Sequence, residues 1–171
     1  MKLSGRTIKQ RLYGLRQLPG MVARARYFRG HGVHSPYVYS IVRQVFMKSK
    51  LINDEQSELF NELIRIDVPK RRAVELQNLM LHCGYESYAI DSESNCNMLI
   101  LTESTSDNKT KELVNKAAQN STTVVIMRPY SVRERTELCN MIIEAHPSTT
   151  VDNHGYLLIF NNHLPKQHFV L

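Results

Sequence analysis

The sequence predicts an α/β fold in which a mainly parallel sheet of about five strands follows a helical N-terminal arm. Residues 97–102 and 121–127 are nearly continuous apolar runs, the pattern of parallel strands that are covered on both faces. Between them, residues 109–119 repeat apolar side chains at helical spacing, so the three segments form a strand–helix–strand unit. The third observation is that residues 1–50 contain no Asp or Glu, which distinguishes them from the rest of the chain as an arm.

The charge pattern divides the chain into a basic arm, residues 1–50, and an α/β domain, residues 51–171. The arm carries a formal charge of +11 and the domain −5, so the net charge of +6 conceals a strong asymmetry. A length of 171 residues fits one domain with an appendage, and 42% hydrophobic residues suffice for a core. The asymmetry indicates an acidic partner and carries no information about the fold.

Two short amphipathic helices are expected within the arm, over residues 5–17 and 20–28. They separate at Pro19 and Gly20, because proline lacks an amide donor and glycine is a poor helix former. Apolar side chains such as Leu12 fall near one face, and the basic side chains lie mostly elsewhere. We assign binding of a polyanion to seven basic residues: Arg6, Lys9, Arg11, Arg16, Arg24, Arg26 and Arg29.

The segment RGHGVHSPYVY, residues 29–39, predicts a turn followed by a helix. Its glycines permit backbone angles that are closed to other residues. Ser35 followed by Pro36 gives an N-cap hydroxyl and a proline at the first helical position, and the helix is expected to end near Lys48. We assign this motif a structural role, docking the arm on the domain, through Gly30, His31, Gly32, His34, Ser35, Pro36 and Tyr39.

Three more helices are expected in the domain. Gly84 marks the end of one of them, as a C-terminal cap. Ser131 and Glu134 have the spacing of a capping box, which predicts the start of another. The three helices are expected over residues 54–66, 70–83 and 131–145.

The remaining strands are predicted from short apolar or alternating segments. Residues 85–90 alternate in the manner of a strand and precede the strand–helix–strand unit. Residues 149–151, 156–160 and 167–170 are expected to close the sheet. The short connections between these closing strands favour antiparallel pairing of the last two.

Two parts of the chain resemble a known family. The motif at residues 29–39 and the tail, TVDNHGYLLIF followed by KQHFVL, are similar to a bacterial family of class I S-adenosylmethionine-dependent methyltransferase-like proteins. The resemblance covers residues 25–48 and 97–171. It implies a truncated, Rossmann-type, methyltransferase-like sheet whose tail forms the antiparallel strand pair that distinguishes methyltransferases from other doubly wound sheets.

The middle of the chain departs from this family pattern. The family's Gly-rich loop, which cradles the methionine part of the cofactor, has no counterpart here, since only Gly84 and Gly155 follow Gly32. We therefore expect a short, degenerate member that binds no cofactor. If S-adenosylmethionine does bind, the resemblance places Asp91 and Glu103 beside it, at the ends of two strands. The alternative is that both are solvated strand ends.

The sequence lacks the residues for several other kinds of chemistry. Cys83, Cys96 and Cys139 are too scattered for a disulfide framework or a zinc site, and we expect reduced thiols. His31 and His34 have no third ligand nearby, so we assign no metal site and no catalytic residue. No apolar stretch approaches the length of a membrane span and the N-terminus lacks a secretion signal, which favours a cytoplasmic protein.

Three functions remain open. The first is a non-catalytic methyltransferase-like module whose basic arm binds RNA or another polyanion, with the aromatic residues beside its arginines either stacking on bases or packing inward. The second is a divergent S-adenosylmethionine-dependent methyltransferase. The third is a structural homo-oligomer in which the arm covers the acidic domain of a neighbouring copy. Binding to a membrane surface ranks last, because the apolar face of the arm is narrow and interrupted at Pro19.

Overall fold

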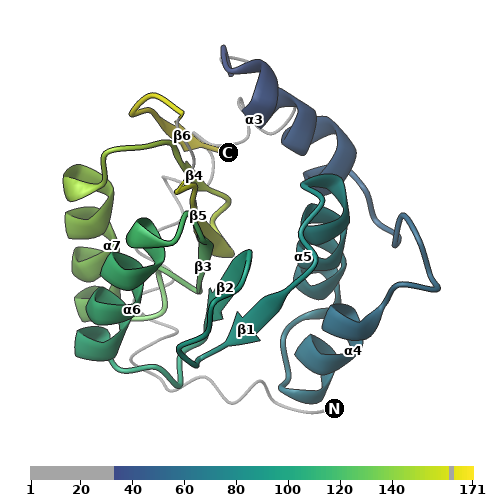
Figure 1. Ribbon diagram of the computed structural model, residues 1–171, viewed down its shortest axis with the longest axis horizontal. Helices are drawn as coiled ribbons and strands as arrows, with labels where there is room; N and C mark the ends of the chain where they lie inside the picture. Colours follow the sequence, from purple (N-terminus) through teal and green to yellow (C-terminus); the bar gives the residue numbers. More distant parts are fainter. Residues whose placement is uncertain (1–32, 162–163) are drawn as a thin grey trace.

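The computed structural model describes residues 33–161 and 164–171. The two helices predicted within the arm therefore lie outside the described residues, as do the seven basic residues assigned to polyanion binding and Gly30, His31 and Gly32 of the motif. In the described part, a mixed sheet stands between two groups of helices (Figure 1). Every helix of this part is too short or too polar to cross a lipid bilayer.

Six strands form the sheet in the described part of the chain, one more than the expected number of about five, in the order β1-β2-β3-β5-β4-β6. All pairs are parallel except those that β5 makes with β3 and with β4. The parallel β2–β3 pair and the helix between them confirm the predicted strand–helix–strand unit. The strands are β1 Tyr88–Ile90, β2 Met98–Leu101, β3 Thr123–Met127, β4 Thr150–Asp152, β5 Tyr156–Ile159 and β6 His168–Val170.

The predicted antiparallel pairing of the last two strands is wrong. Strand β5 pairs antiparallel with β4, and the final strand β6 pairs parallel with β4. A tight turn at residues 153–155 joins β4 to β5, with the Asn153 amide donating to the Tyr156 carbonyl at 3.0 Å. Because β5 uses both of its edges on β3 and β4, the last strand adds to the outer edge of β4 instead.

The helices form two layers, one on each face of the sheet (Figure 1). Apolar side chains of α3, η1, α4 and α5 form one core with the sheet, and those of α6 and α7 form a second core on the other face. Because helices cover both faces of the sheet, the central strands β2 and β3 are buried along their whole length. The helices are α3 Pro36–Ile41, η1 Val42–Phe46, α4 Glu58–Arg65, α5 Lys70–His82, α6 Asp107–Gln119 and α7 Arg133–Ala145.

Local signals in the sequence set the ends of some helices and not of others. The Ser35 hydroxyl accepts from the Val38 amide at 3.4 Å, so the predicted N-cap of α3 is confirmed. Gly84 follows α5 with a φ of +67°, which confirms its capping role. The predicted capping box is wrong, because α7 begins at Arg133 with Val132 in the capping position and no side-chain cap.

Two predicted boundaries also differ from the structure. Helix α4 begins at Glu58 rather than near residue 54, because the Asn53 side chain accepts from the Glu55 amide at 3.0 Å and holds this segment in a turn. The helix from Ser35 continues past Ile41 as the π-helix η1, which ends at Phe46. Leu59 and Leu63 of α4 are buried in the core, whereas Ile66, which the helical spacing also places inward, follows α4 and is 45% exposed.

Candidate functional site

Five strands of the described sheet, β1, β2, β3, β4 and β6, run in the same direction and end at the same edge, and polar side chains lie at the ends of the first four. The first residues after β1, β2 and β3 include Asp91, Glu103 and Arg128, and β4 ends at Asp152. Ligands of open α/β sheets bind at this carboxyl edge. The two acidic residues predicted from the sequence, Asp91 and Glu103, are thus brought to one edge of the fold.

The carboxylate of Asp91 is engaged within the chain. Its oxygens accept from the Thr102 amide at 2.6 Å, from the Thr102 hydroxyl at 2.5 Å and from the Thr105 hydroxyl at 2.5 Å. Lys109 donates to the backbone carbonyl of Asp91 at 3.0 Å. Asp91 directly follows β1 and has a φ of +52°, so the chain turns where the connection from β1 to β2 begins. These contacts join the end of β1 to the residues that follow β2.

Glu103 binds a different partner. Its carboxylate forms an ion pair with the guanidinium of Arg128, which follows β3. The Arg128 backbone amide donates to the Gly155 carbonyl at 2.9 Å, so the pair is anchored to the β4–β5 turn. Asp91 and Glu103 therefore lie on neighbouring strand ends without sharing a partner.

A second polar group at this edge was not predicted from the sequence. The Tyr130 hydroxyl donates to the Asp152 carboxylate, and the Tyr130 ring stacks on His154 with their centroids 5.4 Å apart. Asp152 also accepts from the His154 amide at 2.7 Å. The sequence signal for this group was weak, because a histidine and an acid that follow a strand are usually solvated there.

The most completely buried charge of the described chain is Glu75, on the inner face of α5. Its carboxylate accepts from Arg71 at 3.0 Å, from Arg72 at 2.6 Å, from Asn153 at 3.3 Å and from the Tyr156 hydroxyl at 3.1 Å. Glu75 and Tyr156 are both fully buried. The sequence reasoning overlooked this cluster, whose only local signal was two arginines three and four residues before an acid.

An exposed basic and aromatic strip runs along α3 and η1. Tyr39 and Met47 are 45% and 38% exposed, and Arg43 lies between them and contacts the Met47 sulfur at 3.6 Å. Tyr37 points inward instead, with its ring 5.4 Å from that of Phe160, and burial raises its pKa well above the usual range. The two motif tyrosines therefore differ, since only Tyr39 offers a ring face to the solvent.

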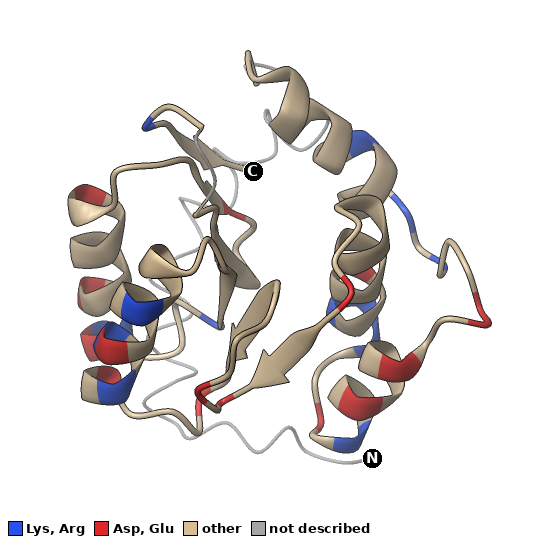
Figure 2. Ribbon diagram, viewed as in Figure 1, with Lys and Arg blue, Asp and Glu red and all other residues tan. Residues whose placement is uncertain are grey.

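The strip leads to a cleft between the end of η1 and the start of α5. Its volume is about 460 Å³, within the roughly 300–1,000 Å³ that is usual for ligand sites. Figure 2 shows Lys and Arg along the helix that begins at α3, along the segment that follows it, and on α5. We call this the basic cleft, and it is lined by Phe46, Met47, Lys48, Ser49, Lys70, Arg71 and Val74.

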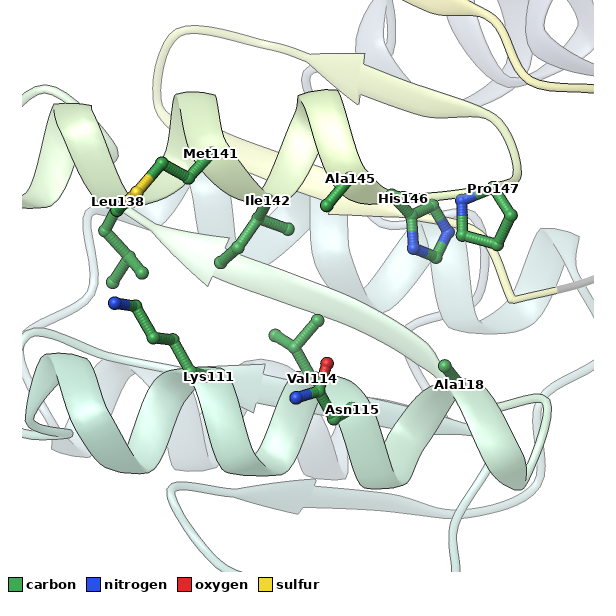
Figure 3. A pocket seen from close by; sticks show the side chains of 10 residues that line it. All are labelled: Lys111, Val114, Asn115, Ala118, Leu138, Met141, Ile142, Ala145, His146 and Pro147. Atoms are coloured by element: carbon green, nitrogen blue, oxygen red, sulfur yellow. The ribbon is translucent and has the colours of Figure 1, made fainter.

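A second hollow, the α6–α7 groove, lies on the other side of the sheet (Figure 3). Val114 and Ile142 point toward one another across it, and Met141 on its rim is 50% exposed. Its volume is about 290 Å³, near the lower end of the usual range. The lining is mainly apolar, so this groove suits an apolar side chain rather than a charged ligand.

The described part of the chain contains no group of three or more His, Cys, Asp or Glu residues that could hold a metal ion. Cys83, Cys96 and Cys139 are free thiols, and burial raises the pKa of each. Of the motif residues, His34 is exposed and Pro36 occupies the first position of α3.

Comparison of the chain with models of protein families, with curated proteins and with solved structures gives no significant match. The family resemblance therefore rests on the two sequence motifs that carry it.

Proposed function

We propose that this protein is a non-catalytic, methyltransferase-like module that binds RNA through its basic arm, including the exposed strip near the end of that arm. The observation that carries the proposal is the exposed succession of Tyr39, Arg43 and Met47 leading into the basic cleft. This strip directly follows a segment with eight basic and no acidic residues before Val33. Basic charge over this length favours a polyanion.

An exposed aromatic ring among the cations favours RNA over other polyanions. Single-stranded bases stack on aromatic side chains, while Lys and Arg hold the phosphates. Tyr39 offers such a ring, and Arg43 is one helical turn away on the same face. Heparin-like or lipid polyanions would use the cations and would gain nothing from the tyrosine.

The carboxyl edge of the sheet supports a non-catalytic role. Asp91 and Glu103, the acids that would bind the cofactor, are held by Thr102, Thr105 and Arg128. Binding S-adenosylmethionine there would require these bonds to break. Strand β5 is antiparallel to its two neighbours, β3 and β4, which are parallel to each other. This arrangement supports a methyltransferase-like sheet that retains the family's C-terminal strands and lacks its Gly-rich loop.

The test is a titration of fluorescein-labelled oligouridine with the full-length protein at two salt concentrations. Affinity should fall steeply as salt rises, because phosphate contacts release counterions. Tyr39→Ala should weaken binding by about 1–3 kcal/mol at either salt concentration, the range found for base–aromatic stacking. Arg65→Ala, which removes an exposed charge from α4, serves as the control and should have little effect.

Two results would count against RNA binding. The first is affinity that is absent at low salt or does not change with salt. The second is equal affinity for heparin and for the RNA together with no effect of Tyr39→Ala, which would indicate a polyanion held by charge alone.

A specific observation also favours self-association as a second function. The apolar α6–α7 groove is open, and the exposed acids Glu137 and Glu144 lie on either side of Met141 along α7. The helix predicted over residues 5–17 of the arm has an apolar face and no acid. We propose that the groove of one copy accepts the arm of another.

Sedimentation at several protein concentrations tests this second function. The wild type should form a dimer that Met141→Glu dissociates, since a charge would then stand at the apolar rim. Ile64→Glu, at a similarly exposed site on α4, is the control and should leave the dimer intact. A wild-type protein that stays monomeric at all concentrations would rule the association out.

A further inference from the structure

The basic cleft combines cations with an apolar wall, and the two come from different elements. Lys48 and Ser49 follow η1, whereas Lys70 and Arg71 form the first turn of α5. We propose that this cleft binds one nucleotide of the RNA, with its phosphate among the cations and its base against the apolar wall. The inference rests on the proposed RNA binding and assigns a particular nucleotide-binding pocket to it.

The cleft offers an apolar surface for a base and cations for a phosphate. Phe46 and Val74 are 7% and 4% exposed, and with the more exposed Met47 they form an apolar wall. Lys48 and Lys70 are both exposed at its rim. A volume of about 460 Å³ lies within the roughly 300–1,000 Å³ of small-molecule sites. An apolar surface next to cations suits a planar base that carries a phosphate.

The cations of the cleft are only partly neutralised by the protein. Arg71 and Arg72 both bind Glu75, which is buried beneath them. Within residues 33–161 and 164–171, neither Lys48 nor Lys70 forms an ion pair. One carboxylate thus faces several cations, and the positive charge that remains is exposed at the cleft.

The location of these cations on α5 is unfavourable for the helix itself. Its first turn carries Lys70, Arg71 and Arg72 and no acid, although acidic side chains are the ones that stabilise a helix N-terminus. Glu75 pairs with Arg71 and Arg72, whereas Lys70 has no ion-pair partner within the described residues. A phosphate bound between Lys48 and Lys70 would offset the repulsion between these cations and the positive N-terminal end of α5. The bound anion would therefore stabilise the folded protein.

The cleft also adjoins the exposed strip. Met47 belongs both to the exposed strip and to the cleft wall. Arg43 contacts the Met47 sulfur at 3.6 Å. A strand that stacks on Tyr39 and follows Arg43 would thus arrive at the cleft within the same face of the helix.

The experiment uses the full-length protein and the double variant Lys48→Ala/Lys70→Ala. Both lysines are exposed, so the variant should fold, which circular dichroism and thermal unfolding check. Its affinity for labelled oligouridine should fall about tenfold at low salt, and the slope of log affinity against log salt should become shallower by about 0.7, the contribution of one single-strand phosphate. The double variant Arg65→Ala/Lys166→Ala removes equal charge from exposed sites outside both hollows and should change affinity less than about twofold.

A second arm of the experiment separates a nucleotide from a simple anion. Uridine monophosphate and inorganic phosphate are titrated separately, with the amide signals of residues 46–49 and 70–74 as the readout. The nucleotide should bind more tightly than phosphate, and Met47→Ala should reduce this difference. Equal binding of the two would overturn the base-binding wall.

The outcomes distinguish this inference from the proposed function. Unchanged RNA affinity in Lys48→Ala/Lys70→Ala, combined with weaker binding in Arg24→Ala/Arg26→Ala, would overturn the cleft and leave RNA binding by the arm standing. Absence of RNA binding by the wild type would overturn the proposed function. Uridine monophosphate binding that the cleft variant abolishes would then still support a nucleotide site.

Discussion

The Tyr156 hydroxyl donates a hydrogen bond of 3.1 Å to the Glu75 carboxylate, and both side chains are fully buried. The bond ties α5 to β5, two elements 81 residues apart in the chain. Burial first of all, and then the charge of Glu75, raise the pKa of Tyr156 well above its usual range. Arg72 completes the cluster, with its guanidinium 5.5 Å from the centre of the Tyr156 ring.

Removing the buried acid should destabilise the protein strongly. Glu75→Ala removes the acceptor of the Tyr156 hydroxyl and the carboxylate that pairs with Arg72, and loss of one partner of a buried pair costs about 3–5 kcal/mol. Tyr156→Phe removes one hydrogen bond to a charged group and should cost about 1.5–3 kcal/mol. Glu137→Ala, which breaks an exposed pair with Arg133, should cost less than about 1 kcal/mol.

Urea unfolding curves measure these three free energies. If Glu75→Ala cost no more than Glu137→Ala, the buried cluster would not join α5 to the sheet in the way described.

Gly155→Ala should destabilise through a single neighbour. A Cβ at this position would overlap the Arg72 guanidinium, which must then leave Glu75. The expected cost is about 1–3 kcal/mol, the range for overpacking in a filled site. In an Arg72→Ala background the same change should cost less than about 0.5 kcal/mol.

Gly84→Ala provides the matched control for this cycle. Gly84 has a φ of +67° and an open surrounding, so alanine there should cost about 1–2 kcal/mol through the backbone alone. Arg72→Ala should leave that cost unchanged. If the cost of Gly155→Ala did not depend on Arg72, the overlap would not be its cause.

The stability of the fold should fall in mild acid partly through His146. Burial chiefly lowers the pKa of this imidazole below its ordinary 6.5, and the positive charge of Lys166 adds to the shift against an opposing hydrogen bond at the Phe160 carbonyl. Above pH 6.5 both folded and unfolded chains hold His146 neutral. As the pH falls below 6.5 the unfolded chain takes up the proton first, so stability decreases until the folded-state pKa is reached.

The measurement compares unfolding free energies of the wild type and His146→Gln between neutral pH and mild acid. The variant should lose less stability over this range, because its side chain takes up no proton. Parallel pH profiles for the two proteins would show that His146 makes no contribution.

The cysteines should react slowly with iodoacetamide while the protein is folded. Burial raises the pKa of Cys139 to about 12 and that of Cys96 above its usual value, so little thiolate exists at pH 8. Both side chains are also shielded from solvent, whereas Cys83 is partly exposed and should be labelled first. Mass spectrometry of native and denatured samples measures the order. Rapid native labelling of Cys139 would contradict its buried position.

Isothermal titration with S-adenosylmethionine should give no heat of binding, because Asp91 and Glu103 are engaged by neighbouring side chains. Asp91→Asn should lower the unfolding free energy, since the variant loses charge-assisted bonds worth about 1.5–3 kcal/mol each. Heat of binding in the wild type that Asp91→Asn abolishes would instead favour the divergent methyltransferase.

The cores could be predicted from the sequence because they depend on short-range patterns. The apolar runs at 97–102 and 121–127 became β2 and β3, and the helical spacing of residues 109–119 became most of α6. Ser35 and Gly84 fix helix ends through contacts within a few residues, so their roles were also predictable. The acid-free arm is likewise a property of the sequence alone.

Tertiary structure decided the features that depend on distant partners. Strand β6 pairs with β4 because β5 has no free edge. The short connections seen in the sequence do not indicate which strand edges are free. Glu75 is buried because donors from Asn153 and Tyr156 reach it across the fold, although its own neighbours give little sign of it. The basic cleft exists because the packing of η1 on α5 places Lys48 near Lys70. Sequence patterns thus determined which faces are apolar and where charge is concentrated, and packing alone determined which of those charges meet.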